Sequence, residues 1–283
     1  MRIQIGLLLL LLAGQAGAAP ASRDPVAAHP KGTCSPCGSL AEQAIGAVPE
    51  LATVKRGRAH VAIRGHVARP KQKAMVLLVE QVIADVERRF LATKGDPHPE
   101  ITLCLFSDDK RYEAIASVFG PIPSDLGFYM PGPRIALANV GKSIGNLRHE
   151  LVHPLIGDDF PRVPAWLNEG LGSLYGTARW NKDRFEFLVN YRLRDLQRAL
   201  KAGRLPSLEQ LATSTDDEVR GVDGSVWYAM SRYVLLYLDR LGKLGPFYAE
   251  LRAARGDVGA QKTILLRYVD EKAFRAWAKQ LEY

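Results

Sequence analysis

One segment limits the fold of this chain more than any other. Residues 147–175 contain the pattern His-Glu-x-x-His, at His149, Glu150 and His153. On a helix, residues four apart lie one turn apart on the same face, so both histidines can offer a ring nitrogen to one metal ion. Glu150 lies beside that pair, whereas the neighbouring leucines fall on the opposite side. The segment therefore predicts a helix with one metal-binding face and one face packed into a core.

The same pattern indicates a hydrolytic zinc site. Such a site usually takes three protein ligands, leaves a fourth position for water, and uses the glutamate as general base, here Glu150. The sequence offers three candidates for the third ligand. Distance favours Glu169, because the proline-rich residues 157–164 predict a reversal into a second, antiparallel helix. Asp158 and Asp159 remain alternatives, since they follow the second histidine closely.

The N-terminus has the pattern of an export signal. Arg2 precedes a leucine-rich run over residues 6–13, and small residues follow up to Ala18. The run is short for a membrane span, so we expect residues 1–18 to be a signal peptide that is cleaved after Ala18. This predicts a secreted or periplasmic protein without stable membrane insertion after cleavage.

The composition then changes twice along the chain. Residues 19–57 are rich in Ala, Pro, Gly and Ser, and we expect a flexible N-terminal arm there.

Cys34 and Cys37 form a C-x-x-C that no further cysteine pair or histidine completes as a zinc knuckle. A local disulfide is expected, with Cys104 as a buried thiol. The catalytic domain is expected over residues 58–283.

Hydrophobic periodicity predicts the α+β class. Residues 58–145 read as a small mixed β-sheet lobe, and residues 146–283 read as a mostly helical lobe packed against it. The candidate metal site falls at the seam, where ligand sites often lie. Strands are predicted over residues 59–67, 101–106, 126–130 and 134–139, and helices beyond the metal-binding one over residues 73–91, 109–119, 169–175, 184–200, 206–211, 225–241, 247–255 and 272–281.

The net charge restricts the partners. The chain carries a formal charge of +8 with a pI near 9.4. Its basic residues are spread along the chain and are not interleaved with aromatic residues, which argues against a nucleic-acid partner. A solvated basic face, with weak attraction to anionic surfaces, is expected instead.

Tyr228 is a further candidate, within the predicted helix over residues 225–241. It points away from the apolar stripe that includes Met230 and Val234. A tyrosine there could face a cavity and donate to an oxyanion, or it could lie half exposed on the surface. Periodicity alone leaves both alternatives open.

The chain resembles the gluzincin metallopeptidases of the peptidase-MA-like kind, and is distantly similar to thermolysin and to the zinc aminopeptidases. The segments LRHELVH (residues 147–153), PAWLNEGL (164–171) and YAMS (228–231) carry the resemblance. It implies a zincin-like fold over about residues 59–250. It also implies that the strand over residues 134–139 is a sheet edge beside the cleft, which could pair with an extended peptide substrate.

The resemblance implies a role for each matching residue. His149, His153 and Glu169 would hold one Zn²⁺ ion. Glu150 would be the catalytic general base, and Tyr228 would be a second catalytic residue that contacts the oxyanion. The function implied is that of an exported zinc-dependent metallopeptidase acting on a peptide or protein substrate.

The chain also departs from the family pattern. The spacer between His153 and Glu169 is shorter than in the aminopeptidases. Their Gly-x-Met-Glu-Asn motif, which grips the free amine of a substrate, is absent, and this favours an endopeptidase. Pro154, directly after the second histidine, predicts that the helix ends or kinks there. Two alternative functions remain, a zinc hydrolase of cell-wall peptides and a non-catalytic zinc-containing envelope or binding protein. The presence of Glu150 argues against the second, because a structural site needs no base.

Overall fold

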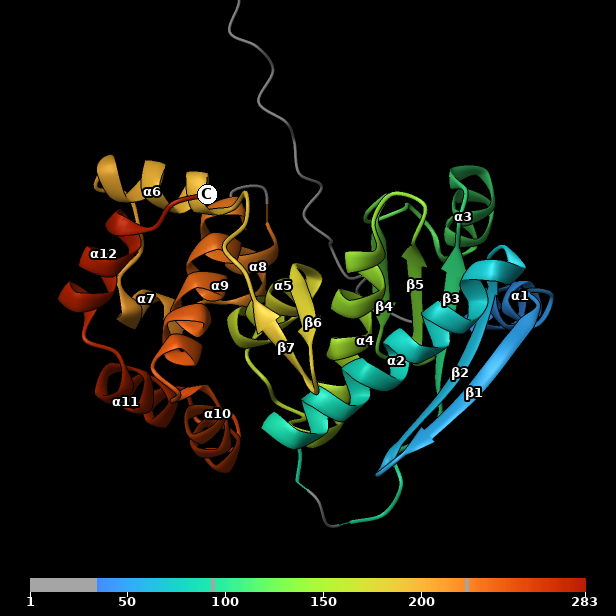
Figure 1. Cartoon of the computed structure of the whole chain (residues 1–283), viewed down its shortest axis with the longest axis horizontal. Helices are drawn as coiled ribbons and strands as arrows, with labels where there is room; N and C mark the ends of the chain where they lie inside the picture. Colours follow the sequence, from blue (N-terminus) through green and yellow to red (C-terminus); the bar gives the residue numbers. More distant parts are fainter. Residues whose placement is uncertain (1–34, 93–94, 222–223) are drawn as a thin grey trace, which may run out of the picture.

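The computed structural model describes residues 35–92, 95–221 and 224–283, and its class is α+β as predicted (Figure 1). A mixed five-stranded sheet comes first and a mostly helical region follows. The expected signal peptide, and Cys34 of the expected disulfide, lie outside the described residues. No helix in the described part of the chain is both long and apolar enough to cross a membrane.

The sheet has the strand order β1-β2-β3-β5-β4. The hairpin β1–β2 is antiparallel, β2, β3 and β5 run parallel, and β4 is antiparallel to β5 at the edge. The four predicted strands are confirmed as β2, β3, β4 and β5. The strands are β1 (Glu50–Arg56), β2 (Ala59–His66), β3 (Ile101–Phe106), β4 (Gly127–Met130) and β5 (Ile135–Asn139).

The edge beside the site is β4, and the expectation that the strand over residues 134–139 is an edge was wrong. β5 is enclosed, because it pairs with β3 on one side and β4 on the other. The two strands form one local hairpin, and the sequence of a hairpin does not indicate which of its strands reaches across to the rest of the sheet.

The expected flexible arm over residues 19–57 was also wrong in its later part. Helix α1 spans Ser35–Gly46, and β1 pairs along its length with β2. Val54 and Val48 are buried, so this segment contributes to the core. The Ala- and Gly-rich composition of this segment did not predict β1, because the strand contains few apolar residues.

Helices cover both faces of the sheet. Because neighbouring strand residues point to opposite faces, Leu103 and Leu105 join the core formed with α2 (Arg69–Arg89) and α4 (Ile144–Asp159). Cys104 and Phe106 join a second core on the other face, formed with α1, α3 (Asp109–Ala116) and a short 3₁₀ turn (Ser117–Phe119).

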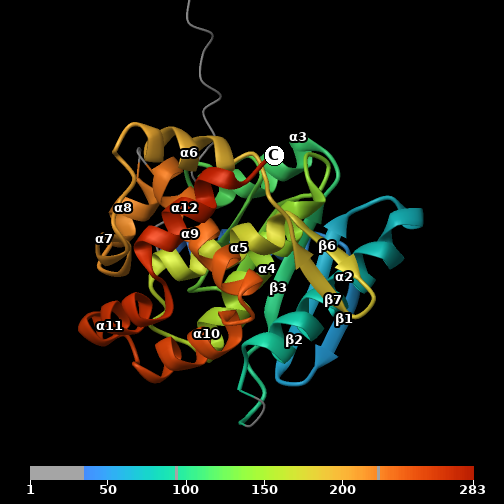
Figure 2. The same cartoon turned by 60° about the vertical axis from the view of Figure 1, so that its left-hand side comes forward.

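The helical lobe contains one hairpin that the sequence did not predict (Figure 1, Figure 2). The helix expected over residues 184–200 was wrong at its start. Phe185 and Phe187 recur at a period of two, and their rings pack on Tyr175 at centroid distances of 5.6 and 5.1 Å. The elements are α5 (Ala165–Gly176), β6 (Ala178–Asn181), β7 (Arg184–Phe187), α6 (Leu193–Lys201), α7 (Leu208–Ala212), α8 (Asp216–Arg220), α9 (Gly224–Arg240), α10 (Leu244–Ala253), α11 (Val258–Tyr268) and α12 (Glu271–Gln280).

Cys104 offers a test of the second core. Burial raises the pKa of its thiol to about 12. At pH 8 only about one folded molecule in 10⁴ would then carry the reactive thiolate. In a Cys34→Ser/Cys37→Ser variant we expect no reaction with a disulfide reagent until denaturant is added. Stoichiometric labelling of the folded protein within minutes would contradict this packing.

Candidate metal centre

Helix α4 carries both motif histidines on one face. Ser143 caps its N-terminus by accepting a hydrogen bond from the backbone N–H of Gly145 at 3.1 Å. The rings of His149 and His153 lie 4.8 Å apart between centroids and are nearly perpendicular. Together with Glu150 they form a group whose potential ligand atoms all lie within 4.8 Å of one another. The predicted metal-binding face is therefore present.

Pro154 does not end this helix. Of the two predicted outcomes, an end or a kink after His153, the first is excluded because helix α4 continues to Asp159. A proline removes only one backbone hydrogen bond, here the one to the carbonyl of Glu150. Leu155 and Ile156 in the following turn are fully buried, and this packing holds the turn in place.

Helix α5 brings Glu169 to the two histidines. Its carboxylate Oε2 lies 3.4 Å from His149 Nε2 and 3.8 Å from His153 Nε2. Two ligand atoms in a tetrahedral zinc site, each about 2.1 Å from the ion, lie about 3.4 Å apart. The distance from Glu169 to His149 equals this value, and the distance to His153 is 0.4 Å longer.

The rival ligands lie elsewhere. Asp158 pairs with Arg134 at 2.7 Å, and Asp159 pairs with Arg252 at 2.6 Å. Asp159 also accepts a hydrogen bond from the Tyr248 hydroxyl at 3.0 Å. The two aspartates thus serve to connect α4 with neighbouring segments, and the geometry favours Glu169.

Neighbouring groups orient two of these side chains. Asn168 Oδ1 lies 3.1 Å from His153 Nδ1, and because an amide oxygen only accepts, the ring carries its proton on that nitrogen and presents Nε2 to the site. Arg220 donates from Nε to Glu169 Oε1 at 2.9 Å, which directs the other oxygen toward the histidines. Sequence reasoning missed both partners. Asn168 lies within a motif, but no local signal pairs Arg220 with Glu169.

Gly172 provides the space for the histidine rings. A Cβ atom at this position would lie 3.0 Å from His149 Nε2 and 3.1 Å from His153 Cε1. A side chain there would push against both rings. The Gly that follows the Trp-Leu-Asn-Glu-Gly-Leu run is thus needed for the close approach of α5 to α4.

Glu150 is a buried carboxylate next to the candidate ligands. Its Oε2 lies 3.9 Å from His153 Nε2 and has no hydrogen-bond partner within the described residues. Burial, and then the charge of Glu169, raise the pKa of Glu150 well above its usual range. A carboxylate in such a place is poised to accept a proton from a nearby group or to interact with a cation.

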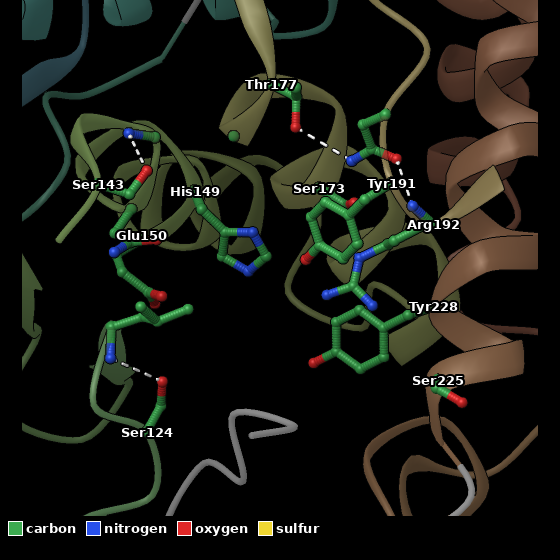
Figure 3. A pocket seen from close by; sticks show the side chains of 15 residues that line it. Ser124, Ser143, His149, Glu150, Ser173, Thr177, Tyr191, Arg192, Ser225 and Tyr228 are labelled. Carbon is green, nitrogen blue, oxygen red and sulfur yellow. Dashed lines mark hydrogen bonds between the residues drawn. The ribbon is translucent and has the colours of Figure 1, made fainter. Parts of the chain in front are cut away.

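Tyr228 lies in the wall of a cavity of about 320 Å³ that His149 and Glu150 also line (Figure 3). It is 3% exposed, so the half-exposed alternative is excluded. Burial, and then the carboxylate of Glu169, raise the pKa of Tyr228 well above its usual range, so its hydroxyl keeps its proton and can donate it in a hydrogen bond.

Comparison with known proteins finds no matching family and no matching curated protein. The function of the chain must therefore be inferred from its own residues.

Proposed function

We propose that this protein is an exported zinc-dependent endopeptidase. The observation that carries the proposal is the convergence of His149, His153 and Glu169 around one point, with the buried Glu150 beside them. Two imidazoles and one carboxylate are a donor set that Zn²⁺ prefers, and three protein ligands leave one position for water or substrate. The unpartnered oxygen of Glu150 supports a catalytic site over a closed structural one.

The chain's own residues supply the remaining chemistry. A bound zinc ion would supply Lewis-acid polarisation of a substrate carbonyl and would acidify water. Glu150 takes a proton from the attacking water and later delivers it to the leaving amine. The hydroxyl of Tyr228 donates a hydrogen bond to the oxyanion that develops on the carbonyl. Asn168 holds His153 in the tautomer that leaves Nε2 available.

The sheet edge supports a peptide as substrate. Within the described residues strand β4 pairs with β5 alone, and an edge strand is where an extended chain can add to a sheet. Gly127 of β4 lies against Glu150, since a Cβ there would be 3.0 Å from Glu150 Cγ. Leu126, which precedes the strand, lines the cavity. A peptide added at this edge would pass directly beside the general base.

Export and partners follow from the sequence. The signal-like residues 1–18 support a secreted or periplasmic location, and the dispersed basic residues support weak attraction to anionic surfaces without a nucleic-acid partner. Fusing residues 1–18 to a reporter enzyme tests the first point, because export and cleavage after Ala18 are expected.

The central experiment combines metal analysis with a digest. We expect one zinc per chain after purification and cleavage of unfolded proteins and proteome-derived peptides, abolished by a chelator and restored by Zn²⁺. A panel of cell-wall peptides run in parallel separates the two hydrolase alternatives. Stoichiometric zinc without turnover would identify a binding protein, and a chain that holds no zinc would overturn the proposal.

The space at Gly172 gives a prediction about metal affinity. In a Gly172→Ala variant the new methyl group displaces both histidine rings, and we expect about a tenfold or greater loss of zinc affinity. Competition with a chromophoric chelator measures it. Gly157→Ala is the matched control, because this glycine of α4 has open space around its Cβ position. Equal affinities of the two variants would contradict the geometry.

A further inference from the structure

Arg192 differs from the other arginines around the cavity. Arg148 donates to the carbonyl oxygens of Tyr175 and Gly176, and Arg220 donates to Glu169. The guanidinium of Arg192, by contrast, forms no salt bridge and no hydrogen bond to any residue that the structure describes. It nevertheless lines the same cavity as His149 and Glu150. A cation that lines a cavity and has no anionic partner among the described residues is a candidate to bind an anion.

Two tyrosine rings hold this arginine in place. Its Cζ lies 4.9 Å from the ring centroid of Tyr228 and 5.3 Å from that of Tyr191, and Figure 3 shows the guanidinium between the two rings. These contacts hold the group at the cavity wall. Its N–H donors form no hydrogen bond to a described residue, and two of them match the two oxygens of a carboxylate.

The cavity suits a charged ligand. Most of the other side chains that line it are small and polar, among them Ser124, Ser173 and Thr177, and Leu126 is the one aliphatic side chain among the described lining residues. The charge of Glu169 is already balanced by Arg220. A divalent cation bound beside Glu150 would leave the cavity with a net positive charge.

We propose that Arg192 binds a carboxylate of the substrate, so that the enzyme prefers peptides with an acidic side chain or a free C-terminal carboxylate close to the cleaved bond. This inference rests on the proposed peptidase function. The proximity follows because Arg192, His149 and Glu150 line one cavity of about 320 Å³. Arg192 then determines specificity and takes no part in the proton transfers.

Matched peptides test the preference. Fluorogenic peptides with Glu or Gln at each position around the cleaved bond form one arm, and peptides ending in a free acid or an amide form the other. In the native enzyme we expect one arm to show about a tenfold to hundredfold higher kcat/KM for the carboxylate member. Arg192→Gln should abolish that ratio. The arm that responds identifies the source of the carboxylate.

Arg194→Gln is the control, because Arg194 has the same charge and lies two residues away, stacked on Tyr283 and outside the cavity. This variant should keep the native ratio. A native enzyme that cleaves both members of every pair equally well would overturn the proposal, as would an Arg192→Gln variant that keeps the ratio.

A binding measurement separates this inference from the proposed function. Calorimetry of the zinc-loaded protein with N-acetylglutamate and with N-acetylglutamine needs no turnover. We expect the carboxylate ligand to bind about tenfold or more tightly, and Arg192→Gln to remove the difference. If no peptide is cleaved but the difference is present, the peptidase function fails and the carboxylate site stands. A carboxylate that binds equally to the native protein and Arg192→Gln is held by the metal alone, and the inference fails.

Discussion

Replacing Glu150 with glutamine is expected to reduce peptide hydrolysis about 10²- to 10⁴-fold while the protein keeps its zinc. The amide has nearly the shape of the carboxylate but cannot accept a proton from water. The proposed zinc ligands are His149, His153 and Glu169, and Glu150 is not one of them, so we expect the metal content to stay unchanged. Hydrolysis of an unfolded protein, with zinc measured on the same sample, checks both statements.

The fold of this variant should also be intact. Burial raises the pKa of Glu150, so the charged form is costly in the folded, metal-free protein, and a neutral amide avoids that cost. The midpoint temperature of thermal unfolding should therefore be no lower for this variant than for the native protein. The exposed Glu113 on α3 provides a control, since Glu113→Gln should leave activity unchanged. Full activity of Glu150→Gln would exclude Glu150 as the base.

Replacing Asp85 with alanine is expected to lower the free energy of unfolding by about 3–5 kcal/mol. Asp85 is fully buried on α2 and accepts hydrogen bonds from Arg89 at 2.9 Å and from the Tyr175 hydroxyl at 2.8 Å. It also accepts one from the backbone N–H of Phe185 at 3.3 Å. The residue thus joins the sheet lobe to α5 and β7. Alanine would leave the Tyr175 hydroxyl and the Phe185 amide without this acceptor, and among the described residues Arg89 would keep only Asp239 as a carboxylate partner.

Urea unfolding followed by tryptophan fluorescence measures this loss. Asp183 is the matched control, because it also pairs with an arginine of α2, Arg88, but its side chain is 81% exposed. Asp183→Asn should lower the free energy of unfolding by about 1 kcal/mol or less, because an exposed ion pair contributes no more than that to stability. An Asp85→Ala protein as stable as the control would mean that Asp85 contributes little to holding the two lobes together.

Local patterns predicted most elements correctly. The strand over Ile101–Phe106 is a short run of β-favouring apolar residues, and α9 has a long apolar stripe at helical spacing. Both signals lie entirely within the segment that forms the element. The errors arose where the signal was short or weak. The four residues of β7 were absorbed into the helix that follows, and β1 contains few apolar residues within a polar stretch.

The sequence by itself determined the central part of the site. The four-residue spacing of His149 and His153 places both on one helix face, because the helix repeat is a local property of the backbone. The same spacing places Glu150 beside them. The motif could therefore be located, and its chemistry proposed, without knowledge of any long-range contact.

Which residues from other elements lie against the histidine-bearing face of α4 was decided only by the tertiary structure. The choice of Glu169 over Asp158 depends on how α5 packs against α4, and the pairing of Arg220 with Glu169 spans 51 residues. Likewise, periodicity placed Tyr228 off its helix's apolar stripe, but only the packing of neighbouring elements forms the cavity that it shares with Arg192. The spacing of residues along one helix follows from its own geometry, whereas the position of one element against another is set by the packing of the whole core.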